Sequence, residues 1–429
     1  KAVNLLLNGF VVVFGLLVIR HITGSLGIAF LAALLFASVP ARAEAVYWVY
    51  SDSHILSALF SLSAFWAYLK GRKRVSALLF IVGLLFQEGG FLLPLVLLAY
   101  EGTRRSNGAL RDRCIGIVPF GLISMTYLVA RHFIVGAAPT SPLHAWSLLT
   151  AAGYQGWEHL RIFFMQDASA TAYLYEKEMF SPGGGASLIG AVALPLLVAL
   201  GYLLWRFRRD ECFWYAWFWI WIAIAFNVGS YGGYLMAEKT LYLASLGPSV
   251  LMVRLLLSRE RLQPAGLAII CGLLVFNSTQ VYARASSWAN TATYVAKVLE
   301  FEPEFDLALV AGGSTASIEG RYQDAAGYYS RALLLRPDLA QFMEARYVEN
   351  TVLFARELTE EGKNEQAIQA LEDAVEVVPG DSRIHNSMGV VYYLSGEREK
   401  ARKSWDLALQ FDPADFEASQ NLKLLEIPH

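Results

Sequence analysis

The stretch that decides the fold lies near the C-terminus, where residues 389–413 read GVVYYLSGEREKARKSWDLALQFDP. Gly396 divides this stretch into two segments, and Pro413 closes the second one. Glycine adopts the positive φ that a tight turn between helices requires, and proline cannot continue a helix. The stretch therefore predicts two helices that are joined by a short turn and end at the proline.

The same arrangement occurs three times, with the glycine preceding the proline by 17 residues in each copy. The glycine–proline pairs are Gly320–Pro337, Gly362–Pro379 and Gly396–Pro413. An alanine follows each glycine at five and at twelve residues, and a small residue (Gly313, Ala355 or Gly389) precedes it by seven. Small residues let two helices cross closely. An ordinary helical bundle is the alternative, but it does not explain so many matched positions.

The spacing of the prolines identifies the kind of repeat. Pro303 and Pro337 are 34 residues apart, as are Pro379 and Pro413, and 34 is the period of tetratricopeptide repeats (TPR), which have one helix-turn-helix each. The step from Pro337 to Pro379 is 42 residues, and the eight extra residues correspond to about two helical turns. We expect a TPR α-solenoid with repeats at about 303–337, 338–379 and 380–413 and a capping helix at 414–426.

Composition divides the chain into two parts. Residues 1–283 hold 21 Lys/Arg against 13 Asp/Glu, a net of +8, and residues 284–429 hold 14 against 24, a net of −10. The apolar fraction of 55% exceeds the roughly 45–50% of globular proteins, and the excess lies in the first part. We therefore expect an all-α protein, with a polytopic helical membrane domain at 1–283 and an acidic TPR domain at 284–429. The three cysteines have no metal-ligand spacing, and no metal site is expected.

About ten apolar runs in the first part are candidates for membrane spans. They are 2–19, 26–39, 55–69, 75–86, 91–100, 114–130, 187–205, 213–228, 241–257 and 265–283. Several are shorter than the ~20 residues that a straight span needs. The runs 75–86 and 91–100 form either two short spans or a re-entrant hairpin. An amphipathic helix is expected near 146–165, lying on the outer membrane surface.

The distribution of basic residues predicts the orientation. One set of linkers between the runs holds 14 Lys/Arg, whereas the opposite set holds five (Arg42, Arg131, Arg161, Lys177 and Lys239). Basic residues concentrate on the cytoplasmic side of a membrane. The protein is therefore predicted to be an integral membrane protein, as in a bacterial inner membrane, with a periplasmic or otherwise extracytoplasmic TPR domain. Because Lys1 then also lies outside, at least one further span is expected before it.

Several stretches resemble the transmembrane-and-TPR proteins, type C glycosyltransferase relatives that include the O-mannosyltransferases of cadherins. These stretches are PARAEAVYWV (40–49), DSHILSALF (52–60), FQEGGFLLPLVLLAY (86–100), YLVARH (127–132), AEKTLYLASLG (237–247) and RASSW (284–288). The resemblance implies transfer of a sugar from a polyprenyl-phosphate-linked donor to Ser/Thr of exported proteins, with the TPRs binding the acceptor. The family's catalytic acidic residue would lie upstream of Lys1. The chain departs from the family pattern at Arg42, 51–54, Gln87 and 239–240.

Three candidate catalytic residues, Glu44, Asp52 and His54, lie on the predicted outer loop 40–54. A general base for an acceptor hydroxyl belongs on that face of the membrane, although a solvated loop explains the same residues. Glu238 and Lys239 are candidates for binding the donor phosphate, with an ion pair at the interface as the alternative.

Two other candidates for donor binding are Glu88 and Arg131. Glu88 stands among apolar residues, where an unpaired charge is costly. It either serves the donor site, or touches water at a hairpin tip, or pairs with an arginine of another span. Arg131 is a cation at the outer end of a predicted span. If the protein is a transferase, Arg131, Glu238 and Lys239 are expected to converge on one water-facing pocket beneath the 146–165 helix.

Two classes of function remain after these observations. One is the membrane glycosyltransferase, and the other is a non-catalytic TPR scaffold or accessory subunit of a larger membrane complex. Membrane lipid and a protein partner are expected in both cases. The repeat domain has no basic stripe, so nucleic acid is not expected as a partner.

Overall fold

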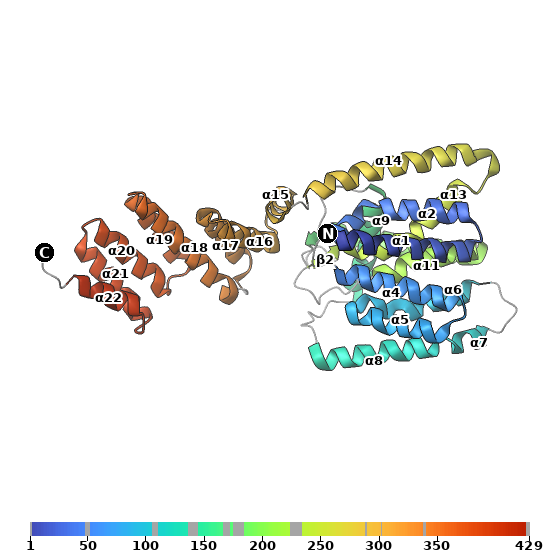
Figure 1. Ribbon diagram of the computed structural model, residues 1–429, viewed down its shortest axis with the longest axis horizontal. Helices are drawn as coiled ribbons and strands as arrows, with labels where there is room; N and C mark the ends of the chain where they lie inside the picture. Colours follow the sequence, from blue (N-terminus) through green and yellow to red (C-terminus); the bar gives the residue numbers. More distant parts are fainter. Residues whose placement is uncertain are drawn as a thin grey trace. The chain divides into compact units, whose positions relative to one another are not determined.

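The computed structural model describes residues 2–47, 52–104, 110–135, 145–165, 172–174, 184–223, 234–287, 290–301, 303–337 and 340–425. The chain divides into two compact units, Lys1–Trp288 (unit 1) and Ala289–His429 (unit 2) (Figure 1).

The described part of unit 1 is helical, apart from one short two-stranded ribbon. Its first helices are α1 (Ala2–Thr23), α2 (Leu26–Ser38), η1 (Pro40–Arg42), α3 (Ala43–Tyr47), α4 (Asp52–Leu69), α5 (Lys73–Phe86), η3 (Glu88–Leu92), α6 (Leu93–Thr103), α7 (Leu110–Ile115), α8 (Val118–Val135) and α9 (Ala145–Met165). They are followed by α10 (Gly185–Phe207), α11 (Arg209–Ile222), η6 (Glu238–Thr240), α12 (Leu241–Ala244), α13 (Leu246–Leu256), η7 (Glu260–Leu262) and α14 (Gln263–Ser287). Figure 1 shows the long helices with roughly aligned axes, and α8 and α14 at opposite edges.

The described residues are helical, as the all-α prediction requires, apart from one short two-stranded ribbon. Strand β1 (Ala172–Leu174) pairs antiparallel with β2 (Tyr234–Ala237), so that Ala172 faces Ala237 and Tyr173 faces Met236. The ribbon joins two segments about sixty residues apart, and each is too short to show the alternation by which a strand is recognised.

Fewer helices than predicted are long enough to span a membrane. By length and composition, four described helices qualify: Ala2–Thr23, Arg113–Ile134, Gly185–Phe207 and Glu260–Ser286. The pair Leu26–Ser38 and Pro40–Tyr47, bent by 59°, would add a fifth if it counts as one broken span. Most of the other predicted runs form shorter helices, such as α5 with 14 residues and α6 with 11, which are separated by η3.

Aromatic side chains of α11 form the centre of unit 1. Trp214 and Trp217 are fully buried, and the ring of Trp217 lies 5.7 Å from that of Phe65 on α4. The indole N–H of Trp217 donates to the Leu243 carbonyl at 3.0 Å. At Gly247 α13 comes so close to α11 that an added Cβ would lie 2.3 Å from the Trp214 carbonyl oxygen. The aromatic run therefore serves helix packing.

The helix predicted near 146–165 forms as α9 and packs along α10. A Cβ on Gly153 would lie 2.2 Å from the carbonyl oxygen of Gly190 on α10, and Gly156 lies against a ring of α11. Further along, Phe163 lines a cavity with residues of α2, α13 and α14. One face of α9 is therefore buried against other helices of unit 1.

Unit 2 consists of helical hairpins. Its helices are α15 (Thr291–Phe301), α16 (Asp306–Ile318), α17 (Tyr322–Leu335), α18 (Ala340–Glu360), α19 (Asn364–Val377), α20 (Ser382–Leu394), α21 (Arg398–Phe411) and α22 (Phe416–Leu424). The turn glycines Gly320, Gly362 and Gly396 have φ of 74°, 76° and 82°, which confirms their predicted role. α18 has 21 residues, whereas α16 and α20 have 13 each, so the eight extra residues are two turns of α18, as predicted.

The small residues of the repeat are packed as the pattern requires. All six alanines, Ala325, Ala332, Ala367, Ala374, Ala401 and Ala408, are fully buried. A Cβ on Gly313 would lie 2.9 Å from the Tyr329 ring, and one on Gly389 would lie 2.4 Å from Trp405 Nε1. Each glycine therefore makes room for an aromatic residue of the second helix in its own hairpin.

Candidate functional site

Lys239 and His54, two of the predicted site residues, line one small cavity of unit 1. The Lys239 cavity has a volume of about 70 Å³ and is lined by His54, Ser57, Ala58, Ser61, Gln87, Gly89, Trp221, Lys239, Thr240, Tyr242 and Leu243. Pockets that bind whole small molecules are typically about 300–1,000 Å³. In its present form this cavity has room for a group the size of a phosphate, not for a sugar with its lipid phosphate.

Glu44 fixes the position of the turn that carries Lys239. Glu44 is only 2% exposed, and its Oε2 accepts the backbone N–H of Lys239 at 2.8 Å. The bond joins α3 to η6 across almost two hundred residues of sequence. Glu44 therefore acts as a buried structural acceptor, and of the three catalytic candidates only His54 lines the cavity. Asp52 is exposed at the start of α4.

The neighbouring Thr240 is held by His159 of α9. His159 is fully buried, with Nδ1 2.7 Å from the Gln155 carbonyl oxygen and Nε2 2.9 Å from the Thr240 hydroxyl. A carbonyl oxygen only accepts, so Nδ1 carries the proton and Nε2 accepts from Thr240. Burial lowers the pKa of His159 to about 4. The ring is thus a neutral bridge between α9 and the turn.

Glu88 and Arg131 bind each other. Arg131 Nε lies 2.6 Å from Glu88 Oε2, and each side chain is about one third exposed, at 32% and 31%. Of the readings that the sequence left for Glu88, pairing with an arginine of another helix matches this geometry. Gln87 and Gly89 face the Lys239 cavity, whereas neither Glu88 nor Arg131 is among its lining residues. The expected meeting of Arg131, Lys239 and Glu238 in one pocket is therefore not seen in the described residues, and the side chain of Glu238 lies outside them.

A buried polar cluster at the bend after α2 was not anticipated. Arg42 is 2% exposed, and its guanidinium donates to the Phe36 carbonyl at 2.7 Å and to Asn8 Oδ1 at 2.6 Å. The Tyr242 hydroxyl donates to the same Asn8 oxygen at 2.8 Å. Asn4, one helical turn earlier, donates to the Val46 carbonyl at 3.4 Å. The signal in the sequence is this pair of asparagines at i and i+4, which share one face of an otherwise apolar helix.

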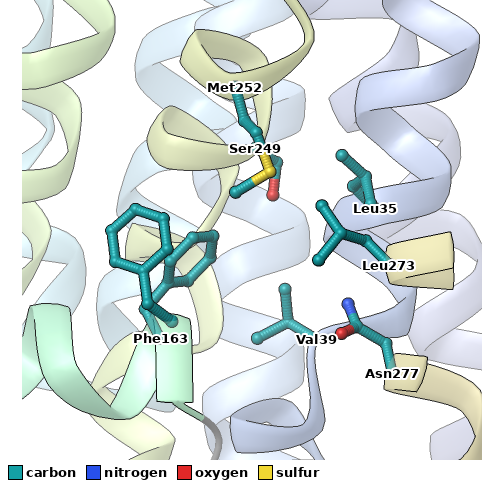
Figure 2. Close-up of a pocket in the computed structure, with 8 residues that line it drawn as sticks. Leu35, Val39, Phe163, Ser249, Met252, Leu273 and Asn277 are labelled. Atoms are coloured by element: carbon teal, nitrogen blue, oxygen red, sulfur yellow. The ribbon is translucent and has the colours of Figure 1, made fainter. Parts of the chain in front are cut away.

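A second cavity, of about 30 Å³, lies between α2, α9, α13 and α14. Figure 2 shows Phe163, Leu35, Val39, Met252 and Leu273 forming apolar walls around it. Asn277 donates to the Ser38 hydroxyl at 3.1 Å, and its Oδ1 has no hydrogen-bond partner in the described part of the chain. The volume suffices for about one water molecule.

The largest of these hollows is in unit 2. A groove of about 640 Å³, called the unit 2 groove, lies along α18 and α20 and reaches the start of α22. It is lined by Glu349, Val352, Leu353, Gly380, Asp381, Ser382, Arg383, Asn386, Ser387, Phe411, Asp412, Asp415 and Glu417. This volume falls within the range of ligand-binding pockets. The described residues contain no cluster of three His, Cys, Asp or Glu placed to hold a metal ion.

Comparisons with known proteins add little to this geometry. No protein-family model and no curated protein sequence matches the chain. One similar solved structure is titled "Crystal structure of APC/C hetero-tetramer Cut9-Hcn1". It is 12% identical, covers 86% of this chain and 76% of its own, and has a TM-score of 0.26. So low a TM-score supports no argument, and the assignment of TPR-like repeats rests on the helical hairpins of unit 2.

Proposed function

We propose that the chain is a membrane-anchored TPR protein whose unit 2 binds an extended polypeptide. The observation that carries this proposal is the unit 2 groove, which is large, open and built from repeated positions of successive hairpins. Helical repeats commonly bind partners along such extended surfaces.

Unit 1 would serve as the membrane anchor. Its helices direct apolar side chains outward, including Leu85, Phe133, Ile134 and Phe207, which are at least 70% exposed. Water-exposed surfaces rarely carry so much apolar area, whereas lipid tails accommodate it. The charge asymmetry of the linkers supports an extracytoplasmic unit 2.

Cysteine labelling tests this topology. In a cysteine-free background, Gln410→Cys on the exposed face of α21 should react with a membrane-impermeant thiol reagent in intact cells. Arg72→Cys, between α4 and α5, should react only after the cells are opened. The reverse pattern would contradict the orientation.

Filling the groove tests the binding function. Ser387 lines the groove on α20, and a tryptophan there would occupy it. The chain in detergent should lose binding of immobilised extended peptides on Ser387→Trp and keep it on Ser330→Trp, which makes the same change on α17. Equal binding by both variants would show that the groove is not the binding site.

A second candidate function is sugar transfer from a polyprenyl-phosphate-linked donor to a Ser/Thr hydroxyl. The Lys239 cavity supports it, because a cation that stabilises a leaving phosphate and a group that accepts a proton both line it, in Lys239 and His54. The small volume of the cavity makes this candidate the weaker one.

Loss of Lys239 tests the transferase. If the cation meets the donor phosphate, Lys239→Ala should lower sugar transfer by about 10²–10³-fold without changing expression. Lys363→Ala, an exposed lysine of unit 2, is the matched control. Transfer that survives Lys239→Ala would remove this role for the residue.

A further inference from the structure

The unit 2 groove is built from the same positions of two successive repeats. Glu349, Val352 and Leu353 line it on α18, and the residues 34 positions later line it on α20. The spacing i, i+3, i+4 places such residues on one face of a helix. The two faces therefore form one surface that continues across two repeats.

The lining is strongly acidic. Five carboxylates contribute to it, from Glu349, Asp381, Asp412, Asp415 and Glu417, against one guanidinium, from Arg383. Arg383 is already neutralised locally, because its Nη2 lies 2.6 Å from an oxygen of Asp381. The groove thus presents negative charge to a partner.

The carboxylates differ in the hydrogen bonds and ion pairs that they already form within the fold. Asp415 accepts the backbone N–H of Ala418 at 3.0 Å, and Asp412 accepts that of Ala414 at 2.9 Å, so both stabilise the start of α22. Glu349 and Glu417 are exposed, and neither forms an ion pair with a residue that the structure describes. Glu417 Oε2 accepts a hydrogen bond from the Asn386 amide at 3.4 Å, and Glu349 interacts electrostatically with Arg383. These two glutamates, on α18 and α22, are the groups best placed to meet a cation.

The groove also offers apolar surface beside the carboxylates. Val352 and Leu353 contribute aliphatic surface, and Phe411 is 47% exposed with its ring stacked at 5.2 Å on His385. Lysine and arginine lay their aliphatic stems on apolar surface while the charged head reaches a polar group. A metal ion needs converging ligands, and the described residues contain no such cluster.

We propose that the occupant of the unit 2 groove is an extended polypeptide segment rich in lysine or arginine. This proposal rests on the proposed polypeptide-binding function and adds the chemical class of the partner. The basic side chains would lie along Val352 and Phe411 and pair with Glu349 and Glu417.

Peptide binding to the full chain in detergent tests the proposal. The probes are a fluorescent peptide of alternating lysine, leucine and serine and its counterpart with glutamate in place of lysine. Anisotropy should report binding of the lysine peptide at least tenfold tighter than that of the glutamate peptide, and the difference should shrink at high salt because ions screen the charges. Calcium chloride alone serves to detect a cation site.

Charge reversal locates the interaction. Glu349→Lys and Glu417→Lys should each weaken binding of the lysine peptide about tenfold, whereas Glu365→Lys, an exposed change of equal charge on α19, should leave it unchanged. All three positions are exposed, so the fold should tolerate the substitutions. An equal loss with Glu365→Lys would mean that only net charge matters and would overturn the proposal.

The remaining outcomes separate this proposal from the proposed function. Equal binding of both peptides, each blocked by Ser387→Trp, would overturn the cationic partner and leave polypeptide binding standing. Competition by calcium at low concentration would identify a cation site instead. If neither peptide binds, both proposals fall.

Discussion

Among the described residues, unit 1 buries more of its charged side chains than unit 2 does. Unit 1 buries polar groups such as Arg42, Glu44 and His159 and exposes apolar side chains. Unit 2 buries alanines and carries most of its charged residues on the surface. Buried polar groups stabilise a structure only while each retains its hydrogen-bond partner, whereas close helix crossings depend on residue volume. Unit 1 should therefore be sensitive to the loss of single hydrogen bonds, and unit 2 to added bulk.

The largest expected effect is steric and falls on unit 2. Gly389→Leu places side-chain atoms where Trp405 lies, because even a Cβ would be 2.4 Å from Trp405 Nε1. The shift would also break the bond from that nitrogen to the Asn386 carbonyl, now 3.1 Å long. Overpacking of this kind costs about 3 kcal/mol, which thermal unfolding of unit 2 within the full chain measures.

Gly327→Leu provides the control, because nothing lies within 4 Å of a Cβ at that position of α17. This variant should melt like the wild type or slightly above it, since leucine favours a helix more than glycine does. Similar losses in both variants would show that close packing at Gly389 is not the cause.

The next effect concerns a hydrogen bond of unit 1. Glu44→Ala removes the acceptor of the Lys239 N–H and leaves that buried donor without its partner. The expected cost is about 2 kcal/mol, measured by denaturation of the chain in detergent. Glu44→Gln keeps an acceptor oxygen and should lose much less, and Glu260→Ala, at an exposed site, should lose nothing. If Glu44→Gln were as damaging as Glu44→Ala, the charge and not the bond would matter.

The sequence predicts more of the structure of unit 2 than of unit 1, and the reason is physical. The hairpins of unit 2, including the lengthened α18, follow from the local effects of turn glycines and helix-ending prolines such as Gly362 and Pro379. Each repeat has such a pair at the same positions. In unit 1, local effects of this kind account only for the apolar helices. Its polar partners, such as Asn8 for Arg42, depend on which helices meet, and the sequence does not specify this. The unit 2 groove lies between these two cases, because its lining positions on α18 and α20 are 34 residues apart in the sequence, whereas its depth depends on packing.

Acid should weaken unit 1 through His159. Its pKa is about 4 in the folded chain and about 6.5 when unfolded, so the unfolded chain takes up the proton first. The stabilisation is complete above pH 6.5 and is lost as the pH falls from 6.5 towards 4. At about pH 5.5 the loss should reach about 1 kcal/mol.

The test is to measure melting temperatures across this pH range for the wild type, for His159→Gln and for the control His132→Gln. His132 is an exposed histidine of α8. The pH dependence between 6.5 and 4 should flatten for His159→Gln alone. An unchanged slope in that variant would assign the acid sensitivity to other groups.

The smallest effect should come from Glu88 and Arg131, and it decides whether their contact belongs to the structure or to a site. With both side chains about one third exposed, at 31% and 32%, solvent screens the pair, and a coupling of about 0.5–1 kcal/mol is expected. Denaturation of Glu88→Gln, Arg131→Gln and the double variant measures that coupling, since the double variant should lose less than the two single losses combined. If the ion pair has only a structural role, we expect this coupling together with unchanged function in all three variants. Zero coupling, together with loss of sugar transfer in Arg131→Gln alone, would instead place Arg131 in a donor site and favour the transferase over the scaffold.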